Sequence, residues 1–376
     1  MKFVFASDSF KGTLSSAEIG AMLCESARAA FPGCDCRSVT MADGGEGSVA
    51  AVLSAAGGRT VPVRAHDPLG GAVDAFYGVT DGGCAVIETA AASGLTLIDE
   101  ARRDIRAASS YGTGELIAHA LDAGYADITL ALGGSATNDG GAGAMAALGA
   151  RFLDADGRTL APNGASLRRI ASIDLSHMHP RLTHARFTAM CDVNSPLTGP
   201  LGATMTYGPQ KGASTPALLG ELEAGMENYA RALRRAFPGR DVEFPGAGAA
   251  GGLGAACALF LGAALKPGAE AVLDLTGFDT LLRGADLAVT GEGRADAQSV
   301  RGKAVAAVAA RCKKAGVPLI ALVGSAGPGA NALLGCGVTE LLEVSPDGCP
   351  PPDRAAALYR AAADRFFCAL AAEKRL

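Results

Sequence analysis

The stretch ITLALGGSATNDGGAGAMAALGA at residues 128–150 changes from apolar to glycine-rich to alanine-rich. Its apolar start, 128–132, predicts a strand, and its end, 142–150, predicts a helix, so the glycines between them form a connecting loop. Glycine has no Cβ, so such a loop can approach a ligand closely, and the amides that open a helix point towards an anion. The pattern indicates an α/β unit with a phosphate-binding loop, although a plain tight turn would look similar.

Strands and helices alternate in the same way at both ends of the chain. The first part predicts strands at 2–6, 37–42 and 60–65, with one helix opened by a capping box of Ser15 and Glu18. The remaining expected elements are a helix at 46–56, strands at 286–290, 317–323 and 340–344, and helices at 303–315, 330–335 and 353–374. Alternation of this kind predicts a mainly parallel sheet covered by helices.

The middle of the chain is less regular. Strands at 74–79 and 84–87 are joined by short polar connections, which predicts an antiparallel part. We therefore expect two α/β domains. A doubly wound domain would be built from both chain ends, 1–64 and 283–376, and a mixed-sheet domain, 65–282, would be inserted in it, with the active site in the cleft between them.

Composition and charge exclude several classes of protein. The 376 residues are 49% hydrophobic and 5% aromatic, with no Trp, 51 glycines and a net charge of −5. A chain with no basic block and few aromatic residues is not expected to bind nucleic acid. Ten cysteines are scattered, and the only close pair is Cys34 and Cys36, so reduced, mostly buried thiols are expected rather than a disulfide framework or a zinc site.

One uncharged segment, 245–265, resembles a membrane span by hydropathy, but it contains six glycines. A buried helix after a glycine loop is the better prediction. The chain starts directly with an expected strand, too short for a signal peptide, so we expect a cytoplasmic protein with no membrane partner.

Ligands of α/β sheets bind beyond the carboxyl ends of the strands. Five expected strand ends carry acidic residues, glycines or both: 8–12, 43–47, 133–137, 191–194 and 290–296. The carboxylates there are Asp8, Asp43, Glu46, Asp192, Glu292 and Asp296, and the nearby cations are Lys11, Lys211, Arg294 and Lys303. This mixture suits phosphoryl transfer. Carboxylates bind Mg²⁺, Lys or Arg offsets the charge on the moving phosphoryl group, and glycine amides hold the phosphates. A further carboxylate accepts the proton of the acceptor hydroxyl.

Each candidate also has a purely structural interpretation. Asp43 and Glu46 would cap the following helix, and Asp192 would cap a turn. Lys11 and Lys303 would be solvated cations at helix ends. Lys211 is harder to explain in this way, since proline and glycine fix the turn around it.

Two nucleotide-binding motifs are absent or out of context. Residues 246–251, GAGAAG, match GxGxxG, but no proper strand precedes them, so dinucleotide binding and an oxidoreductase are disfavoured. The only Gly-Lys pair is Gly302-Lys303, and Ala297 stands where a Walker A motif needs its first glycine, which excludes a P-loop kinase.

Taken together, the motifs resemble a known family. In order, they are DSFK at 8–11, ADGGEG at 42–47, DPLG at 67–70, AAASGL at 90–95, GTGELI at 112–117, GGSATNDGG at 133–141, CDV at 191–193, GPQKGA at 208–213, GAAGG at 248–252 and TGEGR at 290–294. This set resembles the bacterial glycerate kinases of the glycerate kinase type-1 family over nearly the whole chain. The resemblance implies ATP- and Mg²⁺-dependent phosphorylation of D-glycerate to 2-phosphoglycerate, and a flavodoxin-like domain beside a second α/β domain.

The sequence departs from the family pattern at four positions. Ser195 stands where the family usually has an Asn, and Asn194 precedes it in this chain. The other changes are Ser48 for Thr, Val305 for Pro and Ser7 for Pro. If the side-chain amide of the family's Asn contacts a ligand, its role in this chain has moved by one residue to Asn194 or passed to the hydroxyl of Ser195. None of the four changes removes a charged group from the candidate site.

These observations give the following expected roles. Asp192, or else Asp8, accepts the proton of the glycerate hydroxyl, while Lys11 and Arg294 stabilise the transferring phosphoryl group. The expected ATP-binding residues are Gly133, Gly134, Ser135, Thr137, Gly291, Glu292, Gly293 and Lys303. The expected substrate-binding residues are Ser9, Lys211 and Asn194, and those for Mg²⁺ are Asp43, Glu46 and Asp296.

Two alternatives remain open at this point. The same kinase could produce 3-phosphoglycerate, because the sequence does not identify the hydroxyl that is phosphorylated. A non-catalytic sensor could use the same loops to bind an anionic ligand without turnover. The sequence is silent on the oligomeric state.

Overall fold

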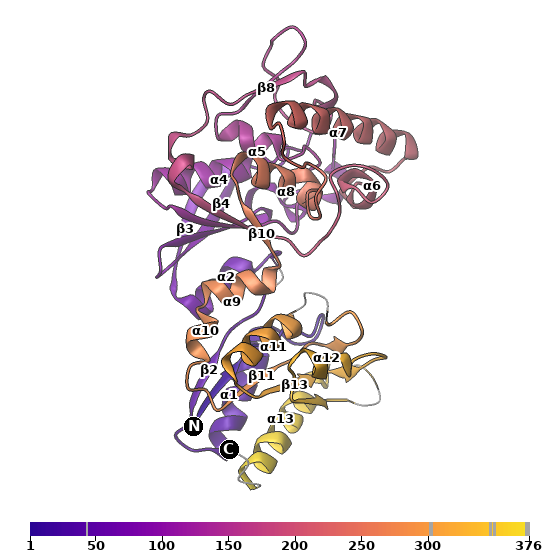
Figure 1. Cartoon of the computed structure of the whole chain (residues 1–376). Helices are drawn as coiled ribbons and strands as arrows, with labels where there is room; N and C mark the ends of the chain where they lie inside the picture. Colours follow the sequence, from indigo (N-terminus) through magenta and orange to yellow (C-terminus); the bar gives the residue numbers. More distant parts are fainter. Residues whose placement is uncertain (43, 301–303, 346–347, 349–350, 373–376) are drawn as a thin grey trace. The chain divides into compact units, whose positions relative to one another are not determined.

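The computed structural model describes residues 1–42, 44–300, 304–345, 348 and 351–372 (Figure 1). The chain divides into two compact units. Unit 1 comprises Met1–Asp43, Ala50–Gly57 and Ala269–Leu376, and unit 2 comprises Gly44–Val49 and Gly58–Gly268. Each unit contains a β-sheet with helices, so the expected α/β class is confirmed.

Unit 1 is built on a sheet of five parallel strands in the order β15-β13-β11-β1-β2. The strands are β1 (Lys2–Phe5), β2 (Asp35–Ser38), β11 (Leu287–Thr290), β13 (Leu319–Val323) and β15 (Glu340–Glu343). Numbered along this unit, their spatial order is 2-1-3-4-5, which is the order of flavodoxin-like sheets. The sheet therefore has the doubly wound topology expected from the sequence.

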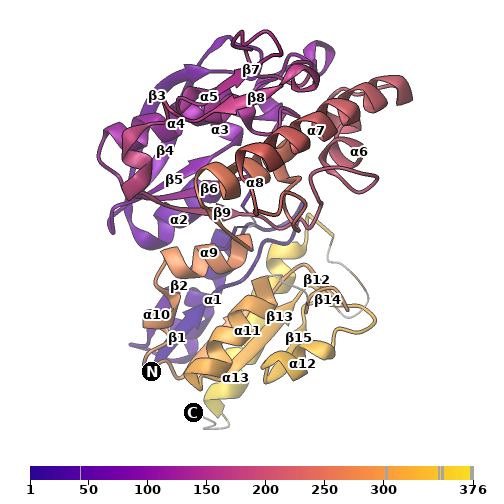
Figure 2. The same cartoon turned by 45° about the horizontal axis from the view of Figure 1, so that its top comes forward.

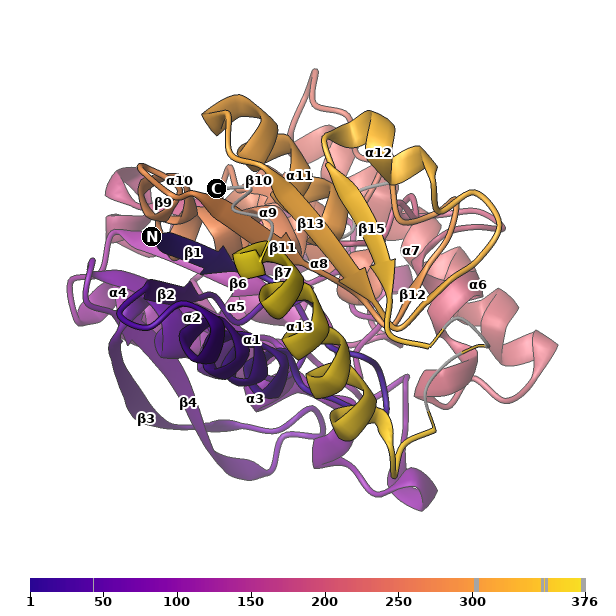
Figure 3. The ribbon, with the colours of Figure 1, turned by 90° about the horizontal axis from the view of Figure 1, so that it is seen from below.

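One face of this sheet is covered by α1 (Ser16–Ala30) and α13 (Ala355–Ala372), which lie side by side in Figure 3. The capping box is confirmed, since Glu18 N donates to Ser15 Oγ and the Glu18 carboxylate accepts from Ser15 N. Alternate side chains of β1, β11 and β13 form a core with the two helices: Phe3, Phe5, Leu287, Val289, Ile320, Leu322, Ile19, Leu23, Tyr359 and Phe367. The period of two along each strand is what places these residues on one face.

The other helices of unit 1 are shorter. Among the described residues they are α9 (Gly268–Leu275), which begins at the last residue of unit 2, α10 (Phe278–Leu281), α11 (Ala304–Ala315), α12 (Ala332–Cys336) and most of α2 (Ser48–Ala56). Two short strands, β12 (Arg294–Ala295) and β14 (Ser325–Ala326), also belong to this unit. Helix α11 packs on β11 and β13.

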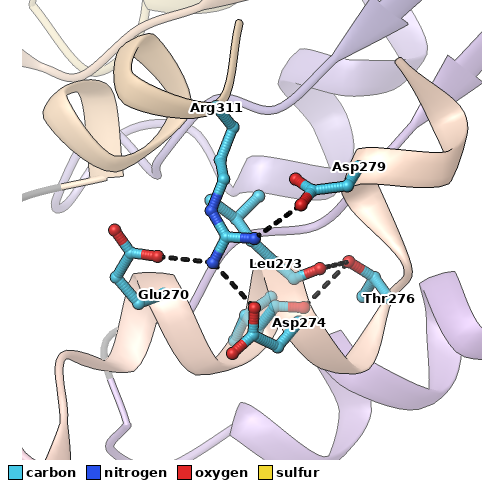
Figure 4. Close-up of polar contacts among 7 residues, drawn as sticks. Glu270, Leu273, Asp274, Thr276, Asp279 and Arg311 are labelled. Atoms are coloured by element: carbon cyan, nitrogen blue, oxygen red, sulfur yellow. Dashed lines mark hydrogen bonds and ion pairs between the residues drawn. The ribbon is translucent and has the colours of Figure 1, made fainter. Parts of the chain in front are cut away.

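An ion-pair cluster joins α9 and α10 to α11 (Figure 4). The guanidinium of Arg311 lies 2.7 Å from Glu270, 2.7 Å from Asp274 and 3.1 Å from Asp279. These hydrogen bonds raise the pKa of Arg311 above its usual range. One half-buried cation therefore holds three carboxylates from two neighbouring helices.

Unit 2 has a mixed sheet in the order β10-β9-β6-β5-β4-β3. Its strands are β3 (Gly58–His66), β4 (Ala72–Thr80), β5 (Cys84–Glu88), β6 (Asp127–Ala131), β9 (Arg186–Met190) and β10 (Ala264–Lys266). Strands β5, β6, β9 and β10 are parallel, whereas β3 and β4 continue the sheet in antiparallel fashion. The mixed sheet and its antiparallel part agree with the sequence prediction.

Helices pack on this sheet around a large apolar core (Figure 2). They are α3 (Ala90–Ser93), α4 (Tyr111–Asp122), α5 (Ala142–Ala147), α6 (Ala203–Tyr207), α7 (Pro216–Ala236) and α8 (Ala249–Phe260), with a small antiparallel pair, β7 (Arg151–Leu153) and β8 (Ser172–Asp174). Helix α8 is the buried helix expected within 245–265. In the part of the chain that the structure describes, no helix has the length and apolarity that a membrane crossing needs.

Several boundaries differ from the prediction. The second strand lies at Asp35–Ser38 rather than 37–42, and the second helix, α2 (Ser48–Ala56), begins two residues later than expected. The expected domain boundary at residue 64 falls inside β3, which pairs with β4 along its whole length. Short-range patterns fix the type of an element better than its ends.

Candidate functional site

The first group of candidate residues lies in unit 1, after β1 and β11. These two strands are neighbours in the sheet, and they flank the point where the strand order reverses. The amide of Asp8 donates to the carbonyl of Gly291 over 2.9 Å, which joins the two loops directly. A ligand site is expected at such a switch point in an open parallel sheet.

Asp8 and Lys11 are presented by a tight turn. The Asp8 carboxylate accepts a 2.7 Å hydrogen bond from Ser9 N, and Phe10 N donates to the Leu14 carbonyl. The ring of Phe10 is buried and packs edge-on against Tyr359 of α13, with ring centroids 5.4 Å apart. Because Phe10 anchors the turn, the following side chain of Lys11 is exposed at the surface.

The glycines of the second loop are closely packed. A Cβ on Gly291 would lie 2.1 Å from the Leu322 carbonyl oxygen, and one on Gly293 would lie 3.3 Å from Phe10 Cα. Glu292 between them is buried. The loop therefore lies close to β13 and to the turn that carries Lys11.

The remaining candidates of unit 1 follow this loop. Arg294 is exposed and belongs to β12, which pairs with β14. The Asp296 carboxylate accepts a hydrogen bond of 2.7 Å from Gln298 N, and the amide of Asp296 donates one of 3.0 Å to Ser299 Oγ. Lys303 and Asp43 lie outside the described residues.

The second group of candidates lies in unit 2, where the glycine-rich segment 133–141 follows β6. Gly134, Gly140 and Gly141 have φ values of +79°, +65° and +71°, which side-chain-bearing residues rarely adopt. Gly133 N donates to the Gly44 carbonyl over 2.9 Å. The expected strand, loop and helix are present, although the helix, α5, is only six residues long.

The GAGAAG motif packs against this glycine loop. Gly140 N donates to the Gly251 carbonyl, and a Cβ on Gly251 would lie 2.0 Å from the Thr137 carbonyl oxygen. Ala250 has φ +51°, and it starts a left-handed stretch that continues to Gly252. These glycines are thus explained by backbone packing, and the disfavoured dinucleotide motif has a structural function here.

Lys211 lies inside unit 2. Its side chain is buried, and Nζ donates to Ser135 Oγ over 2.8 Å and to the Thr137 carbonyl over 2.7 Å. Burial lowers the pKa of Lys211 to about 7, and the nearby Asp139 carboxylate partly opposes this shift. Lys211 therefore connects the 3-10 turn Pro209–Lys211 to the glycine loop.

Asp139 is a buried carboxylate that the sequence analysis did not single out. It accepts hydrogen bonds from Ser110 N at 2.7 Å, Ser110 Oγ at 2.8 Å, and Gly141 N and Gly143 N at 3.1 Å each. Burial nevertheless raises its pKa. These contacts tie the glycine loop to the start of α4 and α5. In the sequence, only the Asp-Gly pair at 139–140, which is typical of turns, could have drawn attention to Asp139.

Asp192 and Asn194 are exposed in the segment that follows β9. Asp192 Oδ1 accepts a hydrogen bond of 2.9 Å from the amide of Gly268. Ser195, which replaces the family's Asn, places its hydroxyl 3.0 Å from the Tyr207 hydroxyl. The departure at Ser195 is therefore accommodated by a contact with α6.

Glu46 is exposed, and a second missed carboxylate, Glu88, lies close to it. Glu88 ends β5, is buried, and accepts a hydrogen bond of 2.7 Å from Val49 N in the first turn of α2. Burial raises the pKa of Glu88, and hydrogen bonds from Val49 and Gly47 oppose the increase. Glu88 thus caps α2, the role that the structural interpretation had given to Asp43 and Glu46.

The candidates form two groups, one in each unit. Unit 1 carries Asp8, Ser9, Lys11, Gly291, Glu292, Gly293, Arg294 and Asp296, and unit 2 carries Glu46, Gly133, Gly134, Ser135, Thr137, Asp192, Asn194 and Lys211. Among the described residues, no three His, Cys, Asp or Glu side chains form a cluster suited to a metal ion.

Comparison with known proteins gives the family. The model of the glycerate kinase family matches residues 3–365. The chain belongs to the glycerate kinase family. It is 43% identical to a glycerate kinase of Bacillus subtilis (strain 168), over 94% of this chain and 92% of that protein. It is 44% identical to a glycerate 2-kinase of Escherichia coli (strain K12), over 86% of this chain and 85% of that protein.

A solved structure agrees with this assignment. A crystal structure described as glycerate kinase 2 from Salmonella typhimurium LT2 superposes with a TM-score of 0.88 at 41% identity, and all of both chains is covered. The glycerate kinase family resemblance found in the motifs is thus confirmed, and the chain is a kinase enzyme. Membership implies glycerate and ATP as its substrates.

Proposed function

We propose that this glycerate kinase transfers the γ-phosphoryl group of ATP to the 2-hydroxyl of D-glycerate, with Mg²⁺, and releases 2-phosphoglycerate and ADP. The observation that carries the proposal is the pair of glycine loops after β6 and β11, each at the carboxyl end of a central parallel strand. The Escherichia coli relative that is named a glycerate 2-kinase supports the choice of hydroxyl.

In unit 1, the switch-point loops supply the contacts for the transferring phosphoryl group. Backbone amides of the segment 291–293 would bind phosphate oxygens, as glycine loops do elsewhere. Lys11 and Arg294 are exposed at this edge, where their charges would offset the charge that develops on the phosphoryl oxygens.

For the proton of the glycerate hydroxyl, we favour Asp192 as the acceptor. The amide of Gly268 fixes one of its oxygens, so the carboxylate has a defined orientation. Asp8, oriented by Ser9 N, is the alternative. The proposed residues come from both units.

The structure favours a changed role for Lys211. Two of the three donors of its ammonium are used inside the loop, on Ser135 and Thr137, and the side chain is buried. We therefore propose that Lys211 positions the glycine loop, and that Ser9 and Asn194 remain the candidates for the glycerate carboxylate. Thr137, whose side chain is also buried, would act through the same loop.

Mg²⁺ binds carboxylates together with phosphate oxygens. Glu46 is exposed and Asp296 is half-buried, so both present the type of donor that the ion needs. With Asp43, they are the residues that we propose to hold it. The ion would supply charge neutralisation between the phosphates of the bound nucleotide.

The direct test is phosphorus NMR of the product formed from D-glycerate and ATP. A phosphorus signal coupled to a single carbon-bound proton identifies 2-phosphoglycerate. Coupling to the two methylene protons identifies 3-phosphoglycerate and would refute the choice of hydroxyl. Release of ADP that requires D-glycerate is expected, and it should be lost when EDTA removes Mg²⁺.

The assignment of the base is tested with Asp192→Asn. We expect kcat to fall by about 10²–10³, since the general base and its charge are lost. Asp156→Asn is the matched control, because Asp156 is an exposed carboxylate of the same unit in a distant hairpin. Turnover within about threefold of the wild type in Asp192→Asn would transfer the role to Asp8.

A further inference from the structure

Two thiols at the edge of the unit 1 sheet lie in contact. The Sγ atoms of Cys34 and Cys36 are 3.3 Å apart, and both residues are half-buried. Nothing in the proposed kinase chemistry uses them. They are the close pair that stands out among the scattered cysteines of the sequence.

The local backbone explains the contact. Cys36 lies in β2, the edge strand, where its partner on β1 is Phe3, and Cys34 comes just before this strand. Residues two apart in an extended chain project to the same side. Both thiols therefore face the helix side of the sheet, where they pack against the core formed with α1.

The two Cα atoms also have a suitable separation for a covalent bond. At about 3.3 Å per residue, an extended chain separates them by about 6.6 Å, near the upper end of the range found for disulfides. A disulfide bond of about 2.0 Å requires the sulfurs to move about 1.3 Å closer. A ring this small is strained, and strained disulfides are readily reduced again.

We propose that Cys34 and Cys36 form a reversible oxidation site that a peroxide converts to a disulfide. The Cys34 sulfur attacks one peroxide oxygen and the O–O bond breaks, which gives a sulfenic acid and, with the thiol proton, one water. The Cys36 sulfur then attacks the Cys34 sulfur, and the S–O bond breaks. The hydroxyl leaves with the Cys36 proton as a second water, so the two thiols lose two electrons to the peroxide.

The neighbouring groups set the order of the two steps. Burial and, after it, the adjacent Cys34 sulfur raise the pKa of Cys36 to about 12, so Cys36 keeps its proton. A third thiol, Cys24 of α1, lies close by, and burial raises its pKa as well, although Arg28 opposes the shift. Cys34 is therefore the sulfur that reacts first.

Trypsin provides a clean test on the whole wild-type protein. Cleavage after Arg28 and Arg37 releases residues 29–37, AAFPGCDCR, which contain both thiols and no other cysteine. The folded protein is treated with hydrogen peroxide, alkylated with iodoacetamide and digested. We expect this peptide to carry no alkyl group and to weigh two hydrogen atoms less than its reduced form, and to take two alkyl groups after dithiothreitol.

Variants separate the two steps. In Cys36→Ser, Cys34 should accumulate as a sulfenic acid that dimedone traps, and in Cys34→Ser, Cys36 should remain available to iodoacetamide. Cys368→Ser is the matched control, since Cys368 is an exposed single thiol, and it should leave the bridged peptide unchanged.

Three outcomes would overturn the proposal. The first is full alkylation of the peptide at a peroxide dose that oxidises Cys368. The second is a bridge that joins residues 29–37 to residues 12–28, because it would assign the bond to Cys24. The third is equally fast oxidation of Cys36 in Cys34→Ser.

Discussion

The ammonium of Lys211 donates a hydrogen bond of 2.8 Å to the hydroxyl of Ser135, inside unit 2. With the second bond, to the Thr137 carbonyl, this contact fixes the glycine loop to a turn that is distant in the sequence. A buried cation with specific acceptors is costly to remove, because its partners lose a donor that water cannot replace.

Lys211→Met tests this contact. We expect the free energy of unfolding to fall by about 1–3 kcal/mol, since Ser135 Oγ and the Thr137 carbonyl are left without their buried donor. Chemical denaturation gives the value. Lys314→Met, at the exposed end of α11, is the control and should change stability by less than about 0.5 kcal/mol. Equal effects of the two variants would contradict the role of Lys211.

The pH dependence of stability reports on the same side chain. The pKa of Lys211 is about 7 in the folded protein and 10.5 in an ordinary lysine. Between these values the unfolded chain holds a proton that the folded chain has lost, so unfolding takes up a proton. The contribution of Lys211 to the free energy of unfolding therefore rises as the pH increases from about 7, by at most about 1.4 kcal/mol per pH unit.

Urea titrations of the wild type and Lys211→Met between about pH 7 and 9 isolate this effect, because other groups titrate alike in both proteins. The difference in unfolding free energy should increase with pH and level off below about pH 7. A difference that stays constant over the whole range would show that Lys211 remains protonated in the folded protein.

Gly251→Ala tests the contact between the two glycine-rich segments. Gly251 has φ +68°, and its Cβ would lie 2.0 Å from the Thr137 carbonyl oxygen. Gly262→Ala is a matched control, since Gly262 has φ +63° and no atom within 4 Å of the added Cβ. In both variants the free energy of unfolding should fall by about 1–2 kcal/mol through backbone strain. Gly251→Ala should lose substantially more, together with kinase activity, and equal losses in the two variants would argue against the contact.

Arg311→Met tests the cluster of Figure 4. Three carboxylates would be left close together without their cation, so we expect a loss of about 1–2 kcal/mol in the free energy of unfolding, smaller at high salt. Arg64→Met removes a single exposed pair, with Asp74, and should cost less than about 1 kcal/mol. A loss in Arg311→Met that does not depend on salt would point to packing rather than charge.

The sequence predicted those features that depend on neighbours along the chain. The capping box of Ser15 and Glu18 depends only on a spacing of three residues. The segment 128–132 was recognised as a strand because it is a short, continuous apolar run followed by glycines. The alternating α/β pattern also predicted that Asp8 and Gly291 follow strands, as they do.

What the sequence could not provide depends on contacts between distant segments. The proline and glycine beside Lys211 indicate a fixed turn but not a buried side chain, because the burial results from packing of the turn at 209–211 against the loop after β6. Asp139 is buried for a similar reason, since its partner Ser110 lies in another segment. The glycines at 251–252 match a dinucleotide motif, and only the fold shows that the Thr137–Gly140 backbone occupies the space beside them.

The assembly of unit 1 from segments at both ends of the chain also has a consequence for synthesis on the ribosome. Strand β1 pairs with β11, whose first residue is Leu287, whereas unit 2 takes its sheet from one continuous stretch of chain. Domains fold as their sequence emerges from the exit tunnel. Unit 2 can therefore complete its sheet while the nascent β1 still exposes an unpaired, apolar edge, and this interval is when we expect the protein to depend most on chaperones.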